Sequence, residues 1–116
     1  MILLVDDFAP SLHLHARMLR GHGFDVQQAD SAGTALKLAA ECRPELVLLD
    51  VHLPDENGFA VCRRLREAYP DVPVVMTSAT YTDDASRVSA MYAGAAEFLP
   101  EPINAAALAK IVKRYL

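Results

Sequence analysis

Short runs of consecutive apolar residues alternate along the chain with longer segments in which apolar residues recur every three or four positions. The clearest runs occupy residues 2–5, 46–49 and 74–76, and each is followed directly by a polar side chain. Strands that are apolar on both faces are typical of a parallel sheet that is covered by helices on each side. We predict two further strands at residues 24–28 and 97–99.

Helices are predicted between these strands, each bounded by a capping residue, a glycine or a proline. They occupy about residues 10–20, from Ser31 to the residue before Pro44, 58–69, from Asp83 or Asp84 to Gly94, and from Pro102 onward. The side chains expected to face the core are those of Leu12, Ala16, Leu19, Leu36, Ala39, Ala40, Phe59, Cys62, Leu65, Leu108, Ile111 and Val112. The sequence therefore predicts five βα units, which form an α/β fold of the doubly wound (βα)5 type. A single domain is predicted to cover residues 1–116.

Composition and charge narrow the class of protein. The chain has 116 residues, of which 53% are hydrophobic, and its net charge is −4 with no basic run beyond Arg63 and Arg64. This argues against disorder and against a nucleic-acid surface within the domain. No apolar run approaches the roughly 18 residues that span a bilayer, and no secretory signal is evident, so we expect a cytoplasmic protein without membrane contact. Cys42 and Cys62 form no CxxC motif and are expected to be small core residues.

Acidic residues follow two of the predicted strands. Asp6 and Asp7 come directly after the first run, and Asp50 comes directly after the run at residues 46–49. In an open α/β sheet the functional crevice lies at the carboxyl ends of the strands. Carboxylates that converge there repel each other unless a cation offsets their charge, and Mg²⁺ prefers oxygen ligands. An isolated Asp at a strand end is usually a turn residue, but this doublet together with a single Asp predicts a metal site.

Three stretches form a recognisable set of motifs, namely residues 4–8, residues 46–54 with Gly58 after them, and residues 73–79. Through these motifs the sequence resembles receiver domains of response regulators along nearly its whole length. It implies the flavodoxin-like receiver fold with strand order 2-1-3-4-5. It also implies a phosphoacceptor switch of two-component signalling, a regulatory domain rather than an enzyme in its own right.

The resemblance also implies roles for the acidic residues. By motif position Asp50 accepts a phosphoryl group from a phosphohistidine, in the presence of Mg²⁺. Asp7 and Asp50 ligate the metal, Asp6 acts largely through water, and the main-chain carbonyl of His52 is a further ligand. The donor is a sensor histidine kinase or a phosphotransfer protein.

Two further residues match the switch of the family. Ser78 falls at the position of the hydroxyl that bonds the phosphoryl oxygen, with its neighbour Thr77 as the alternative. Phe98 falls at the position of the switch aromatic, although simple core packing also explains a Phe there. In the family these side chains change the face formed by the fourth helix, the fifth strand and the fifth helix. Receivers also pair through this face as homodimers, and the sequence leaves the oligomeric state open.

Glu101 departs from the family pattern, which has a Lys before the proline that follows the fifth strand. A carboxylate there replaces attraction for the phosphoryl group by repulsion. Glu101 can turn outward, serve as a fourth carboxylate in metal binding, or disable the acceptor chemistry. A similar Glu or Gln occurs in receiver segments attached to sensor kinases, which favours a working variant and indicates a domain from, or beside, a hybrid sensor histidine kinase. The bond between Glu101 and Pro102 matches the site of a cis peptide in the family, and we predict a cis bond here.

The histidines are given minor roles. His52 and Thr80 occupy positions that border the route of the attacking water in the family, although an exposed loop residue is the simpler interpretation of His52. Magnesium prefers oxygen, so the His52 side chain is a poor ligand candidate. His13, His15 and His22 are predicted to be solvated residues of the first helix, without ligand geometry toward a cysteine and without a phosphodonor role.

Two other functions remain to be weighed. A phosphohydrolase of the haloacid-dehalogenase kind needs a second Asp two residues after its nucleophile, and His52 stands at that position. A degenerate pseudo-receiver would act as an interaction domain without phosphorylation, for which Glu101 is the chief support.

Overall fold

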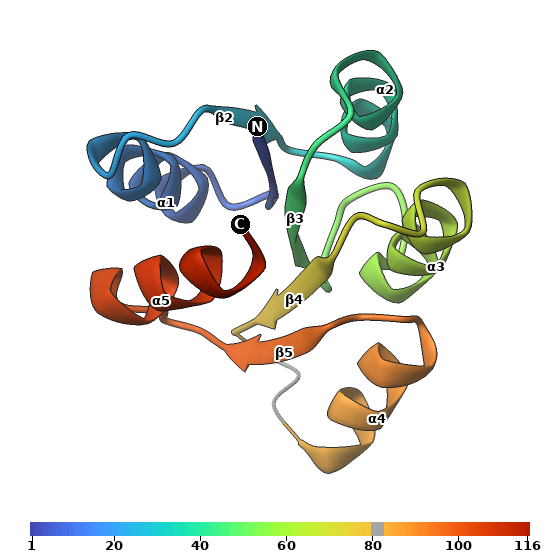
Figure 1. Ribbon diagram of the computed structural model, residues 1–116. Helices are drawn as coiled ribbons and strands as arrows, with labels where there is room; N and C mark the ends of the chain where they lie inside the picture. Colours follow the sequence, from blue (N-terminus) through green and yellow to red (C-terminus); the bar gives the residue numbers. More distant parts are fainter. Residues whose placement is uncertain (80–82) are drawn as a thin grey trace.

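The computed structural model describes residues 1–79 and 83–116, which form a five-stranded sheet with helices on both faces (Figure 1). The strands are β1 (Ile2–Val5), β2 (Val26–Ala29), β3 (Leu46–Asp50), β4 (Val74–Ser78) and β5 (Glu97–Pro100). The helices are α1 (Ala9–Gly21), α2 (Ala32–Cys42), α3 (Gly58–Ala68), α4 (Asp84–Tyr92) and α5 (Ala105–Tyr115). All strand pairs are parallel and the order is β2-β1-β3-β4-β5, so the predicted α/β fold and strand order are confirmed.

The two faces of the sheet carry separate hydrophobic cores. Successive side chains of a strand point to opposite faces, so Leu3 and Val5 pack toward α2, α3 and α4. Ile2 and Leu4 of the same strand pack toward α1 and α5. Figure 1 shows this arrangement, with α1 beside α5 on one face and the other three helices on the opposite face. Helices cover both faces of β1, so each of its side chains is buried and apolar. This explains the uninterrupted apolar run in the sequence.

Side-chain caps start α2 and α4 where the sequence predicts them. The Ser31 hydroxyl accepts a hydrogen bond from the Thr34 amide at 3.2 Å, which caps α2. The Asp83 carboxylate caps α4 in the same way, accepting from the Ser86 amide at 2.9 Å. Each cap satisfies a main-chain amide that the first turn of a helix leaves unpaired. No helix within the described residues is long and apolar enough to cross a membrane.

The second strand begins later than predicted. It covers Val26–Ala29, not residues 24–28. Gly23 has a φ of 88°, a left-handed conformation that suits glycine, so the chain is still turning there. Pairing with β1 starts where the Ile2 amide donates to the Asp25 carbonyl at 2.8 Å. Phe24 is therefore not a strand residue, and its half-buried ring packs against the core on the α1 and α5 face.

Two residues predicted to face the core are exposed. Ala40 and Cys42 in α2 both face solvent, whereas Ala39 is completely buried. Ala40 is one residue beyond Ala39, so the helix turns it by about 100° away from the sheet. Cys62 in α3 is buried, as predicted. The two thiols therefore lie in opposite environments.

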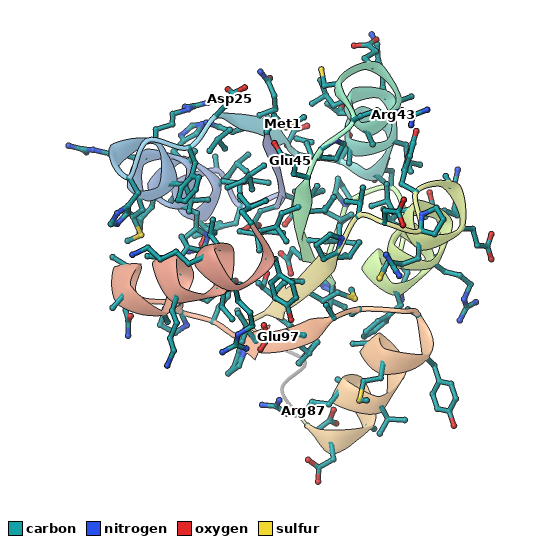
Figure 2. The ribbon with its side chains drawn as sticks, viewed as in Figure 1. Met1, Asp25, Arg43, Glu45, Arg87 and Glu97 are labelled. Carbon is teal, nitrogen blue, oxygen red and sulfur yellow. The ribbon has the colours of Figure 1, made fainter. Side chains whose placement is uncertain are left out.

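The amino end of the chain is fixed at the edge of the sheet opposite the predicted functional end. The Met1 ammonium lies 2.8 Å from a carboxylate oxygen of Glu45, and the two residues are adjacent in Figure 2. The Glu45 amide also donates to the Met1 carbonyl at 2.8 Å. These contacts join the starts of β1 and β3, and so help to align the strands whose carboxyl ends bear the acidic residues.

Candidate functional site

Three carboxylates meet where β1 and β3 end. Val5 pairs with Leu49 in the sheet, which brings Asp6 level with Asp50. One oxygen from each of Asp6, Asp7 and Asp50 lies within 4.8 Å of the others. Asp6 and Asp50 are only 6% and 7% exposed, whereas Asp7 faces solvent. The residues predicted to form the acidic pocket therefore lie together.

Main-chain amides orient two of these carboxylates. The Phe8 amide donates to Asp6 Oδ1 at 2.9 Å. The His52 amide donates to Asp50 Oδ1 at 3.2 Å. Both bonds reach back over two residues, so the turn after each strand holds the carboxylate that ends it. The remaining carboxylate oxygens stay available to a cation.

The environment of Asp50 disfavours its ionised form. Burial raises its pKa from the ordinary 3.8 to about 8, against the lowering effect of the His52 amide, and the charges of Asp6 and Glu101 raise it further. Among the described residues, no lysine or arginine lowers the pKa of Asp50. A hard divalent cation would supply the missing positive charge, and an all-oxygen donor set fits Mg²⁺. The residues present therefore suit this metal.

A cleft of about 330 Å³ lies directly over these carboxylates. Its lining comes from the ends of β1, β3 and β4 and from the segment after β5, and includes Asp6, Asp7, Asp50, His52, Ala79 and Glu101. The space is large enough for a small polyanion beside an ion. Thr80, which was predicted to border this space, lies outside the described residues.

Close packing shapes the loop that follows Asp50. The Gly58 amide donates to the Val51 carbonyl at 2.8 Å. A Cβ at Gly58 would lie only 2.7 Å from Val51 Cα, closer than real Cβ atoms approach. The start of α3 thus lies directly against the end of β3, and only glycine fits at the contact. This is the physical basis for the motif position of Gly58.

Asp55, in the same loop, was not singled out from the sequence. Its two carboxylate oxygens accept hydrogen bonds from the amides of Ala32 and Gly33, at 2.9 and 3.0 Å. These bonds hold the pKa of Asp55 below its ordinary value. The loop after Asp50 is therefore tied to the first turn of α2. A carboxylate at the amino end of a helix is stabilised by the helix dipole. Asp55 is more than twenty residues from α2 in the sequence, so the sequence alone did not indicate this contact.

The two hydroxyl candidates occupy the last positions of β4 and both are buried. Thr77 pairs with Asp50 and lines a small cavity beneath Asp6. Ser78 is 1% exposed, and its carbonyl accepts a hydrogen bond from the Glu101 amide at 2.8 Å. The assignment of Ser78 as the switch hydroxyl, with Thr77 as the alternative, stays a prediction.

Phe98 lies inward on β5. Its ring is 7% exposed and belongs to the core on the α3 and α4 face. The guanidinium of Arg87, labelled on α4 in Figure 2, lies 5.8 Å from the ring centroid. The same side chain donates to the Phe98 carbonyl at 3.4 Å. Arg87 thus links α4 to β5 at the ring, within the face that is predicted to change.

Glu101 faces the cleft and does not turn outward. Its Oε1 is buried and has no hydrogen-bond partner among the described residues. Burial raises its pKa, and the charge of Asp6 raises it further. The predicted cis bond between Glu101 and Pro102 is confirmed. A fourth carboxylate therefore lines the cleft.

His15 was predicted to be solvated, and this is wrong. It is half-buried on α1, and one of its ring nitrogens lies within 4.8 Å of carboxylate oxygens of Asp6 and Glu101. Burial lowers its pKa, although the charge of Asp6 acts in the opposite direction. Its spacing from Leu12 and Leu19, both buried on α1, is the signal that places it at the edge of the inward face. His13 and His22 are exposed, as predicted.

Comparisons with known proteins agree with this geometry. The family model described as "Response regulator receiver domain" matches residues 2–113. The DNA-binding response regulator MtrA of Mycolicibacterium paratuberculosis is 42% identical over 103 residues, which are 89% of this chain and 45% of MtrA. The chain spans less than half the length of the curated relatives it matches.

Solved structures show the same fold. The receiver domain of NtrX from Brucella abortus is 32% identical, with a TM-score of 0.93, and the match covers 100% of this chain and 98% of that domain. A response regulator from Burkholderia pseudomallei, solved with a phosphorylated aspartic acid and a calcium ion, is 29% identical with a TM-score of 0.88. That match covers 99% of this chain and 65% of the regulator. The fold and the acidic strand ends define a signalling domain of the two-component class. The chain belongs to the response regulator receiver domain family, and the phosphohydrolase alternative is set aside.

Proposed function

We propose that this domain is a phosphoacceptor switch in which Asp50 receives a phosphoryl group from a histidine kinase or a phosphotransfer protein. The observation that carries the proposal is the convergence of Asp6, Asp7 and Asp50, within 4.8 Å, at the carboxyl edge of a receiver fold. The phosphorylated aspartic acid in the Burkholderia pseudomallei structure supports it.

The metal in this proposal is Mg²⁺, held by Asp7, Asp50 and the main-chain carbonyl of His52, with Asp6 acting largely through water. When bound, it neutralises charge on the phosphoryl oxygens and on the acceptor. The all-oxygen character of the carboxylate cluster supports the choice of metal. The amide bonds to Asp6 and Asp50 orient the carboxylates before the donor arrives.

The proposed transfer is a displacement at phosphorus. A carboxylate oxygen of Asp50 attacks, the bond from phosphorus to the donor nitrogen breaks, and the histidine of the donor leaves with the electron pair. Water later attacks the acyl phosphate, which releases inorganic phosphate and restores the Asp50 carboxylate. Positioning and charge neutralisation supply most of the catalysis in such reactions, so the domain needs no further nucleophile.

The output of the switch is assigned to the face of α4, β5 and α5. Ser78 moves toward the new phosphoryl oxygens, and Phe98 rearranges behind it. Arg87 of α4 contacts both the ring and the carbonyl of Phe98 in β5. This supports the proposed output, because movement of the ring would alter the contact between α4 and β5. This face is also where two copies would pair if the domain forms a homodimer, and the cytoplasm is the expected location.

The test is phosphorylation by a small donor. The full chain, incubated with Mg²⁺ and phosphoramidate, should gain the mass of one phosphoryl group, and Asp50→Asn should gain none. A folded protein that gains nothing would contradict the proposal and favour the pseudo-receiver. If Glu101→Lys then recovered the gain, the reversed charge at that position would be the cause.

A further inference from the structure

A second group of metal-binding side chains lies beside the acidic pocket. Asp6 ends β1, His15 comes from α1 and Glu101 follows β5, yet one ligand atom of each lies within 4.8 Å of the other two. Asp6 is buried, and the other two are half-buried. Asp6 is also a member of the carboxylate cluster with Asp7 and Asp50, so the two groups share one side chain.

Two observations support the binding of an ion by this group. The buried Oε1 of Glu101 has no hydrogen-bond partner in the described part of the chain, which is costly for a carboxylate oxygen. A cavity of about 20 Å³ is lined by Asp6 and His15 of this group, together with Thr77 and six apolar side chains. A cavity of this size holds about one water molecule or one ion. Glu101 lines the cleft of about 330 Å³, which shares Asp6 with the cavity.

The charge of the region also calls for more than one cation. Asp6, Asp7, Asp50 and Glu101 carry four negative charges when ionised, and one Mg²⁺ offsets only two of them. None of these four forms an ion pair with a described lysine or arginine. A phosphoryl group in the cleft would add further negative charge. A second dication would balance the carboxylates and give Glu101 a role as a ligand.

We propose that Asp6, His15 and Glu101 form a second metal site, selective for a first-row transition dication such as Zn²⁺. The imidazole ligand sets its preference, because Mg²⁺ takes oxygen ligands and nitrogen ligands favour transition metals. Asp6 would ligate this ion directly and act on the cation held by Asp7 and Asp50 largely through water. The site places positive charge beside the acceptor, where Glu101 alone places a negative one.

The test measures metal binding directly in the full chain without a histidine tag. With Mg²⁺ saturating, Zn²⁺ is titrated by calorimetry, and Co²⁺ is titrated by its visible ligand-field absorption. We expect one saturable site per chain. His15→Ala should lower the affinity at least about ten-fold, since loss of even an outer-shell partner costs 10- to 100-fold. His13→Ala, an exposed histidine on the same helix, is the matched control and should bind as the parent does.

Two further variants make the result decisive. Glu101→Gln should lower the Zn²⁺ affinity as His15→Ala does. If circular dichroism shows that His15→Ala is not folded, Glu101→Gln serves as the test of the site. Asp50→Asn should keep the site while losing phosphorylation, which separates this inference from the proposed phosphoacceptor function. Equal titrations for the parent, His15→Ala and Glu101→Gln would overturn the site, as would the lack of saturable binding in the presence of Mg²⁺.

Discussion

Asp50→Asn should stabilise the metal-free protein, because the acceptor carboxyl is held where its ionised form is disfavoured. The pKa of Asp50 lies at about 8, against the ordinary 3.8 expected in the unfolded chain. At pH 7 unfolding therefore releases a proton from Asp50, and at about 1.4 kcal/mol per pKa unit this favours unfolding by about 4 kcal/mol. The amide of Asn is more strongly hydrated than the neutral carboxyl that it replaces, and its extra desolvation costs about 1–3 kcal/mol, so we expect a net gain of about 2 kcal/mol.

The pH dependence follows from the direction of the shift. The folded state binds more protons than the unfolded state between pH 3.8 and about 8, so the free energy of unfolding falls as pH rises through this window. Asp50→Asn removes this group from the titration, and its advantage should grow with pH and level off above about 8. Mg²⁺ stabilises the ionised carboxylate and should reduce the advantage or reverse it.

The assay is urea and thermal unfolding in EDTA, at several values between pH 5 and pH 8.5. A gain of about 2 kcal/mol corresponds to a rise in Tm of roughly 6–10 °C for a domain of this size. Asp71→Asn, the same chemical change at an exposed position, is the control and should leave Tm nearly unchanged. The reasoning is refuted if Asp50→Asn in EDTA at pH 8 is no more stable than the parent.

Three further predictions test other parts of the site and core. Gly58→Ala should lower Tm strongly and abolish Mg²⁺-dependent phosphorylation, because a Cβ there would lie 2.7 Å from Val51 Cα, directly after β3, and a normal Tm would contradict this. Asp55→Ala should speed hydrogen exchange at the Ala32 amide while barely changing α5, and unchanged exchange would show that the tie to α2 is unimportant. Thiol titration of the native protein should find Cys42 reactive and Cys62 inert, because burial raises the pKa of Cys62 to about 11; two fast thiols without denaturant would sink this.

Much of the fold could be predicted because its signals are local. Apolar runs that end in acidic residues mark buried parallel strands, and Ser31 and Asp83 cap the helices that they were expected to cap. The sequence predictions that were wrong concern single residues at the boundary of an element or of a helix face. Ala40 was assigned to the wrong side of α2, and the second strand was placed too early because Phe24 looks like a strand residue but packs from a turn.

The sequence by itself determined the receiver architecture, the convergence of Asp6, Asp7 and Asp50, and the anomaly at Glu101, because strand ends, motif positions and residue charges can be read one segment at a time. Only the tertiary structure decided which way Glu101 faces and that His15 lies beside it. It also decided that Asp55 is bound to the start of α2. These contacts join segments far apart in the chain. Their existence depends on how α1 and the segment after β5 pack against the sheet, and no local pattern encodes that.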